Sequence, residues 1–97
     1  MIILDLTTCK LIKDKKTYNL GYVQIKLLSL LSNNQVCTTN DVARFVYGLN
    51  KFDDYDINNI HNLTKINLYR LKRKCGLDII IRPRIGYMLI NNIKVRW

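Results

Sequence analysis

The sequence predicts an α+β fold in which three helices lie between an N-terminal antiparallel sheet and a C-terminal β-hairpin. Short apolar runs with polar breaks occupy residues 1–20, and helical apolar spacing with start and stop signals occupies residues 21–76. A proline-centred turn then separates two apolar runs within residues 77–90. At 97 residues the chain has room for one modest core, so we expect residues 1–97 to form one domain.

Basic charge is concentrated in the second half of the chain. The formal net charge is +9. Residues 1–55 carry seven basic and five acidic side chains, whereas residues 56–97 carry nine basic and two acidic ones. This asymmetry on a small domain indicates a polyanionic partner, and a generically basic surface is the alternative.

The sequence contains no residue pattern typical of a zinc site, an enzyme or a membrane protein. The three cysteines are widely spaced, no CxxC pair occurs, and His61 is the only histidine, so a zinc site cannot be assembled. No nucleophile motif, paired carboxylates or phosphate loop is present, and we expect no enzyme, cofactor or small-molecule substrate. No apolar run approaches the roughly 18 residues of a membrane span, and no signal peptide is recognised, which predicts a cytoplasmic protein without a membrane partner.

The first 20 residues predict three strands, MIILDL, CKLI and TYNL, with residues 14–16 as the turn between the last two. Strands so close in sequence indicate antiparallel pairing. Lys13, Lys15 and Lys16 could contact phosphate, but a solvated turn explains them better.

A first helix is predicted to begin at Gly21, where Gln24 can complete a weak capping box, and to end at Asn33 and Asn34. Its wide apolar face indicates a core helix. The residues of this face are Ile25, Leu28 and Leu31, with Val23, Leu27 and Leu30 beside them.

A second helix of about ten residues is predicted between the Thr38–Asp41 capping box and Gly48. Val42, Phe45 and Val46 have helical spacing there. An acidic, irregular loop then leads to Asp56.

The third helix is predicted to run from its cap at Asp56 to Cys75 and to end on Gly76. One stripe is apolar and predicts a core face: Ile57, Ile60, Thr64, Leu68, Leu71 and Cys75. The opposite side contains Asn59, Asn62, Ile66, Tyr69, Arg70 and Arg73, flanked by Lys65 and Lys72. A solvated helix face usually mixes acids with bases, yet no acid occurs between Ile57 and Cys75. This absence favours a nucleic-acid face over an ordinary surface.

The C-terminal hairpin is predicted as DIII, a turn at Arg82-Pro83-Arg84, and IGYMLI. Pro83 cannot donate a ladder hydrogen bond, so it belongs at the bend. Arginines at such a tip have no core role, whereas Tyr87 is expected in the core. Residues 91–97 form a basic tail in which a further short strand is an open alternative.

The chain resembles the OmpR/PhoB-type winged helix-turn-helix over nearly its whole length. NLGYVQIKLLSLLSNNQVCTTNDVARFVYG resembles the first two helices of that family, INLYRLKRK resembles the basic end of its recognition helix, and IRPRIGYML resembles its wing. The resemblance implies a winged helix-turn-helix domain, with a C-terminal β-hairpin wing, that binds double-stranded DNA. It also implies a homodimer, at least on DNA.

The resemblance assigns positions to two kinds of contact. Ile66 and Arg70 match helix positions that face bases in the major groove. The positions that match backbone contacts are Tyr69, Lys72 and Arg73. The family's wing places an arginine in the minor groove; its usual Arg-Gly is here Pro83-Arg84, so the inserted side chain is Arg82 or Arg84. The loop before the helix is longer than usual, and no receiver domain precedes the module, so phosphorylation control is not implied.

Side-chain chemistry refines these assignments. Arg70 can pair with guanine, Asn62 can read adenine, and Ile66 can pack on thymine methyl groups. The lysines would hold phosphates, and neutralising about five phosphates predicts a slope of roughly −4 to −5 for log K against log salt. The complete candidate DNA-binding set is Asn62, Lys65, Ile66, Tyr69, Arg70, Lys72, Arg73, Arg82 and Arg84, with no catalytic or metal-binding residue.

Three aspartates, Asp53, Asp54 and Asp56, lie beside the start of the third helix and would repel DNA phosphates. Our hypothesis is that the helix enters the groove less deeply and that the wing arginines are major determinants of binding. Two DNA-binding functions stay open: a transcriptional regulator, or an accessory protein in plasmid or phage DNA processing, for example at a transfer, replication or partition site. A winged helix used only for protein contacts is the third alternative.

Overall fold

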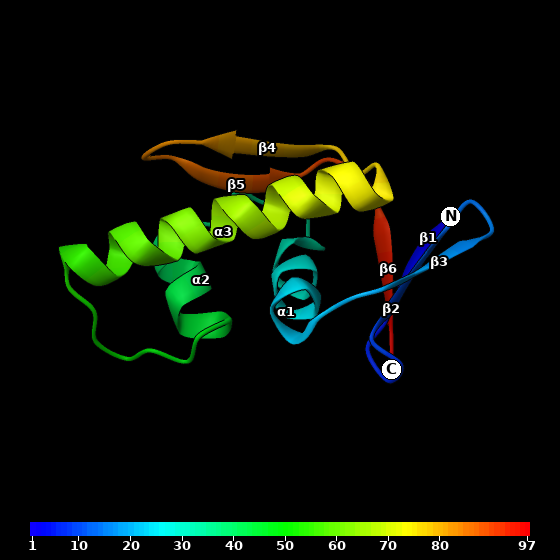
Figure 1. The fold of residues 1–97 in the computed structure, drawn as a ribbon, viewed down its shortest axis with the longest axis horizontal. Helices are drawn as coiled ribbons and strands as arrows, with labels where there is room; N and C mark the ends of the chain where they lie inside the picture. The colour runs from blue at the N-terminus through cyan, green and yellow to red at the C-terminus, as the bar shows by residue number, and fades with distance from the viewer.

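The computed structural model describes all 97 residues, and its helices and strands follow the predicted order. The helix α3 runs along the molecule, with α1 and α2 on one side, the hairpin β4–β5 on the other, and a separate sheet near its C-terminal end (Figure 1). The elements are β1 (Ile2–Asp5), β2 (Lys10–Lys13), β3 (Lys16–Asn19), α1 (Tyr22–Leu31), α2 (Thr39–Phe45), α3 (Asp54–Cys75), β4 (Ile79–Arg82), β5 (Gly86–Leu89) and β6 (Ile93–Arg96).

The N-terminal sheet is mixed, so the expectation of a purely antiparallel sheet was wrong. Its strand order is β3-β2-β1-β6, and β1–β2 and β2–β3 are antiparallel as predicted. The basic tail forms β6, which pairs in parallel with β1. Parallel strands require a long crossover, and here the helices and the hairpin β4–β5 together provide it. Proximity in sequence therefore predicted only the antiparallel pairs.

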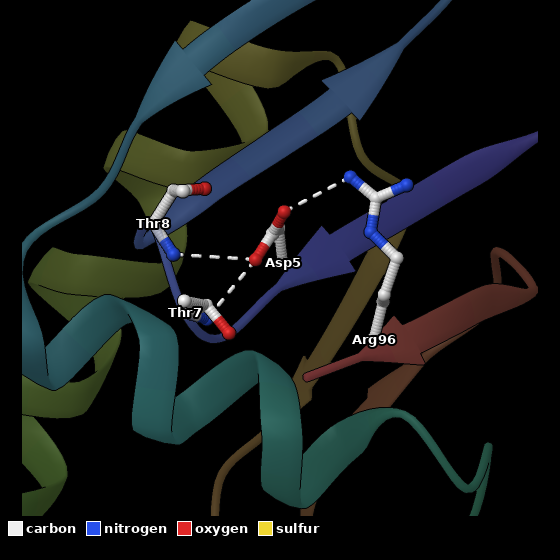
Figure 2. Close-up of polar contacts among 4 residues, drawn as sticks. All are labelled: Asp5, Thr7, Thr8 and Arg96. Atoms are coloured by element: carbon white, nitrogen blue, oxygen red, sulfur yellow. Dashed lines mark hydrogen bonds and ion pairs between the residues drawn. The ribbon is translucent and has the colours of Figure 1, made fainter.

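A buried carboxylate joins β1 to β6 (Figure 2). One oxygen of Asp5 accepts a hydrogen bond from Arg96 Nη2 at 2.9 Å, and the other accepts from the backbone N–H groups of Thr7 and Thr8 at 3.0 and 3.2 Å. These hydrogen bonds lower the pKa of Asp5 below its ordinary value of 3.8. The bond from Arg96 has the largest effect, and the bond from the Thr8 N–H has the next largest. The carboxylate is therefore ionised at neutral pH and stabilises the parallel pair.

The capping bonds predicted for the first two helices are present: one bond at Gly21, which has no side chain to complete a box, and both bonds of the box at Thr38. The N–H of Gly21 donates to the side chain of Gln24 at 3.2 Å, and Thr38 and Asp41 exchange bonds of 2.9 and 3.2 Å. The helix α2 has seven residues instead of about ten, because Val46 is already its C-terminal cap. Phe45 is 45% exposed despite its spacing, and Ala43 is buried in α2 instead.

The helix α3 begins earlier than predicted. Its N-cap is Asp53, not Asp56. The Asp53 side chain accepts from the Asp56 N–H at 2.9 Å, and the Asp56 side chain accepts from the Asp53 N–H at 3.2 Å, so the two carboxylates form a reciprocal box. Gly76, with φ of 66°, ends the helix as predicted. The loop before α3 is correspondingly shorter than expected.

The core stripe of α3 packs on α1, α2 and the hairpin in one cluster of 20 buried residues. Ile57 is only partly buried, and the rest of the predicted stripe is buried: Ile60, Thr64, Leu68, Leu71 and Cys75. Tyr87 is 1% exposed, which confirms its predicted place in the core. None of the three helices has the length and apolar character that crossing a bilayer requires.

Candidate nucleic-acid interface

The side of α3 opposite its core stripe is open to solvent, and we call it the outer face. Ile66 and Tyr69 are 47% and 56% exposed there, although both are large apolar side chains. Lys65, at the flank, is half-buried. The other exposed side chains predicted for this face are Asn59, Asn62, Arg70, Lys72 and Arg73.

A shallow hollow on the outer face is lined by five of the predicted contact residues: Ile66, Tyr69, Arg70, Lys72 and Arg73. The ammonium of Lys72 lies 5.9 Å from the ring centroid of Tyr69, a cation–π distance. The hollow therefore combines an apolar floor with a cationic rim. Such a surface can contact the apolar parts of a nucleic acid while its rim attracts phosphates.

The basic charge around α3 is uncompensated. The only ion pairs in the structure join Lys13 to Asp14 at 3.6 Å and Arg96 to Asp5 at 2.9 Å. Neither involves the seven basic side chains between residues 65 and 84, which are Lys65, Arg70, Lys72, Arg73, Lys74, Arg82 and Arg84. A surface of one sign without internal partners raises the local concentration of a polyanion.

The tip of the hairpin β4–β5 is a tight turn in which the N–H of Ile85 donates to the carbonyl of Arg82 at 3.2 Å. Pro83 occupies the second position, and Arg84 occupies the third with φ of 66°. This is the position at which a type II turn favours glycine. An arginine there costs of order 1 kcal/mol in backbone strain, and residues kept in such positions cluster at functional sites.

A second hollow lies between this tip and the start of α2. The wing contributes both predicted arginines to its lining, and α2 contributes polar side chains that the sequence interpretation did not include. The lining residues are Thr38, Thr39, Asn40, Ile57, Arg82, Arg84, Ile85 and Gly86. At residues 38–41 the sequence pattern predicted only a capping box. Local sequence patterns do not show that these residues lie close to the wing in the folded chain.

The wing is attached to the helical body at Gly86 and Tyr87. Tyr87 exchanges two backbone hydrogen bonds of 2.8 Å with Cys37, in the segment between α1 and α2. Gly86 has φ of 140°, and a Cβ atom there would lie 2.3 Å from the carbonyl oxygen of Cys37. Only glycine permits this close approach of the two backbones.

The phenol of Tyr87 connects the wing to two helices. Its hydroxyl is hydrogen-bonded to Nδ1 of His61 and, at 3.1 Å, to the hydroxyl of Thr39. The rings of His61 and Tyr87 are stacked with centroids 5.6 Å apart. Burial raises the pKa of Tyr87, so the phenol stays protonated and can donate.

His61 is half-buried and packs on the ring of Tyr87. Burial is the main cause that lowers its pKa below 6.5, and the nearby charge of Lys65 lowers it further. The imidazole is therefore neutral at pH 7 and supports the position of Tyr87. Nowhere in the structure do three or more His, Cys, Asp or Glu side chains gather as a metal-binding group would.

The three aspartates and the basic residues occupy opposite ends of α3. Asp53 and Asp56 bond to each other's backbone in the first turn, whereas the bases begin at Lys65 and continue to Lys74. Negative charge suits the N-terminal end of a helix dipole, and positive charge suits the C-terminal end. A polyanion would consequently be drawn to the C-terminal half of the helix.

Comparisons with known proteins agree on this architecture. No protein-family model and no curated protein sequence matches the chain. Among solved structures, the DNA-binding domain of CssR from Bacillus subtilis is similar with a TM-score of 0.73 and 17% identity, over 93% of this chain and 100% of that one.

Two further solved domains are similar. The DNA-binding domain of the response regulator AdeR, in complex with an intercistronic region, has a TM-score of 0.68 and 19% identity, over 93% of this chain and 94% of that one. The DNA-binding domain of CadC from E. coli has a TM-score of 0.61 and 15% identity, over 87% of this chain and 80% of that one. The fold is a winged helix. The hairpin β4–β5 is its wing.

Proposed function

We propose that this chain binds double-stranded DNA in a sequence-specific manner, through the outer face of α3 and the wing, and thereby regulates transcription. The observation that carries the proposal is the unpaired cationic outer face, where the hollow lined by Ile66, Tyr69 and Arg70 is exposed and no acid interrupts the bases. An ordinary solvated face would mix both signs of charge.

The outer face supports two kinds of contact. Arg70 presents a planar guanidinium that can pair with guanine O6 and N7, Ile66 can contact thymine methyl groups, and Asn62 can pair with adenine. Tyr69 and the bases beside it would hold phosphates and set the register without reading sequence. The phosphate-holding bases are Lys65, Lys72 and Arg73.

Arg82 and Arg84 are exposed at the wing tip. In a narrow minor groove rich in A·T pairs, the negative potential is concentrated and attracts arginine. We infer that both side chains contribute strongly to affinity, because the acidic first turn of α3 repels phosphates and limits how deeply that helix enters the groove. Two protomers on neighbouring half-sites would bind as a dimer.

The neighbours support regulation as the process. Each is a DNA-binding domain, and that of the response regulator AdeR is in complex with an intercistronic region. Footprinting on the DNA that flanks the gene tests the process directly. Protection within a promoter supports regulation, whereas protection only at a replication, transfer or partition site favours the accessory role.

Titration of a labelled duplex of about 30 base pairs, roughly three helical turns, tests DNA binding itself. The expected slope of log K against log salt is roughly −4 to −5, for about five phosphates.

Arg70→Ala should weaken binding to the footprinted site by about 1 to 3 kcal/mol and relax selectivity at one base pair. Lys51→Ala removes one exposed charge from the connection between α2 and α3, and is the matched control. Equal effects of the two substitutions would contradict recognition by α3.

The relative weight of the wing is measured with Arg82→Ala/Arg84→Ala. We expect this double variant to lose at least as much affinity as Arg70→Ala. If its affinity barely changes while Arg70→Ala abolishes binding, the wing is not a major determinant.

A further inference from the structure

The hairpin β2–β3 lies beyond the C-terminal end of α3 (Figure 1). The ammonium of Lys74 donates to the backbone carbonyl of Asn19 at the end of β3. The ammonium of Lys13 lies 3.3 Å from the position that a Cβ atom would take on Gly76, directly after the helix. The turn of this hairpin is therefore adjacent to the basic end of α3, although about 60 residues of sequence separate them.

The basic residues of this turn occupy positions at which they destabilise the hairpin. Its two central residues, Asp14 and Lys15, have φ of 51° and 66°, as in the type I′ turns that favour asparagine and glycine. Lys15 is thus strained in its left-handed conformation. Lys13 and Lys16 are direct cross-strand partners at the base of the turn, and like charges in that relation destabilise a sheet.

The charge of the turn is only partly balanced. Asp14 lies 3.6 Å from Lys13 on the surface, whereas Lys15 and Lys16 are exposed and make no ion pair. Together with Lys72, Arg73 and Lys74, they extend the cationic surface past the end of α3. An anionic partner would offset the repulsion between Lys13 and Lys16, which Asp14 balances only in part.

We propose that the β2–β3 turn is an additional contact for the DNA backbone, in which Lys15 and Lys16 hold phosphates of the same duplex that α3 and the wing bind. This inference rests on the proposed function and adds a third contact region to it. The turn lies near the C-terminal end of α3, where the basic residues of the helix gather and which is the end opposite the aspartates. Lysines are point charges, so this contact adds affinity and footprint length without reading sequence.

Lys15→Gly/Lys16→Ala tests the turn without threatening the fold, because glycine is the residue that the backbone at position 15 favours. Removing two phosphate contacts should lower the magnitude of the salt slope by about 1.8, and weaken binding about tenfold near 0.15 M salt. The matched control, Lys51→Ala/Lys94→Ala, removes two exposed lysines outside the turn. Because distant surface charges are screened, we expect about a twofold effect or less from the control.

Hydroxyl-radical footprinting supplies a second readout that a general loss of charge would not reproduce. Wild-type protein should protect sugars beyond the end of the α3 contact on one side only, and the turn variant should lose that protection alone. If Arg70→Ala weakens binding while the turn variant matches its control in slope and footprint, the turn inference is overturned and the proposed function stands. If the wild-type protein does not bind the duplex, both are overturned.

Discussion

The two hairpins that flank α3 have similar tips and different supports. Each tip holds a basic residue at φ of 66°, Lys15 in β2–β3 and Arg84 in β4–β5. The hairpin β2–β3 belongs to a four-stranded sheet and is held by continuous backbone pairing. The wing β4–β5 has only two strands and is attached at Gly86 and Tyr87.

This difference teaches where each hairpin is vulnerable. A two-stranded hairpin is marginally stable by itself, so the wing depends on a few specific contacts with the body. A strand within a larger sheet distributes its support over many hydrogen bonds. Single substitutions should consequently displace the wing more readily than they displace β2–β3.

Gly86→Ala should have the largest effect. The new methyl group would meet the carbonyl of Cys37 at 2.3 Å, and φ of 140° is unfavourable for alanine. We expect the free energy of unfolding to fall by about 3 kcal/mol or more from clash and strain together. Urea denaturation measures this loss. Gly48→Ala is the control, since its φ of 65° imposes strain without any atom within 4 Å, and it should cost only about 1 kcal/mol.

Tyr87→Phe should have the next largest effect, because it leaves the half-buried partners His61 and Thr39 without their shared hydroxyl. We expect a loss of about 1 to 3 kcal/mol in unfolding free energy, together with faster amide exchange in β4 and β5. Tyr18→Phe in β3 alters a half-buried phenol with no hydrogen-bond partner and should change stability by less than about 0.5 kcal/mol. Equal losses in the two variants would contradict the anchoring role of Tyr87.

Arg84→Gly and Lys15→Gly should separate stability from binding in both hairpins. Each replaces a strained side chain by the residue that its turn favours, so thermal unfolding should show stability unchanged or raised by about 0.5 to 1 kcal/mol. DNA affinity should nevertheless fall, and further for Arg84→Gly, which removes a wing guanidinium. A variant that loses both stability and affinity would show that the tip is structural.

Acidification should lower the stability of the wing contact at His61 and of the β1–β6 contact at Asp5 in different pH ranges. A group whose pKa is lowered by folding adds stability above its unfolded pKa and loses it as the pH falls through the folded value. The contribution of His61 should be lost from pH 6.5 downward, and that of Asp5 from pH 3.8 downward. Urea denaturation measured at a series of pH values tests both assignments. The loss of stability below pH 6.5 should be absent in His61→Gln, and the loss below pH 3.8 should be absent in Asp5→Asn. An unchanged pH profile in either variant would contradict the corresponding assignment.

Local signals predicted much of this fold. The capping bonds at Gly21 and Thr38 and the helix stop at Gly76 were confirmed, since each depends on residues a few positions apart. The boundary at Asp53 was missed because several aspartates competed for one cap. Helical spacing placed Phe45 in α2 correctly, but it does not say which side of the helix faces the core.

Long-range relations were beyond sequence patterns. The pairing of β6 with β1 joins Asp5 to Arg96, and the hollow beside the wing joins Asn40 to Arg84. The two residues of each pair are far apart in sequence, so no local pattern connects them. The candidate contact residues on α3 were found through an absence of acids, and their exposure matches that expectation, while their part in binding awaits the titrations above.

The parallel pairing of β1 and β6 has a consequence for how the chain folds during synthesis. The strand β1 is synthesised before the helices and the wing, whereas its second neighbour, β6, is synthesised after them. The helices and the wing can form while β1 still has one open edge, held only by β2. Completion of the sheet is therefore a late step, and the strand edge of β1 stays available to other chains until Arg96 reaches Asp5.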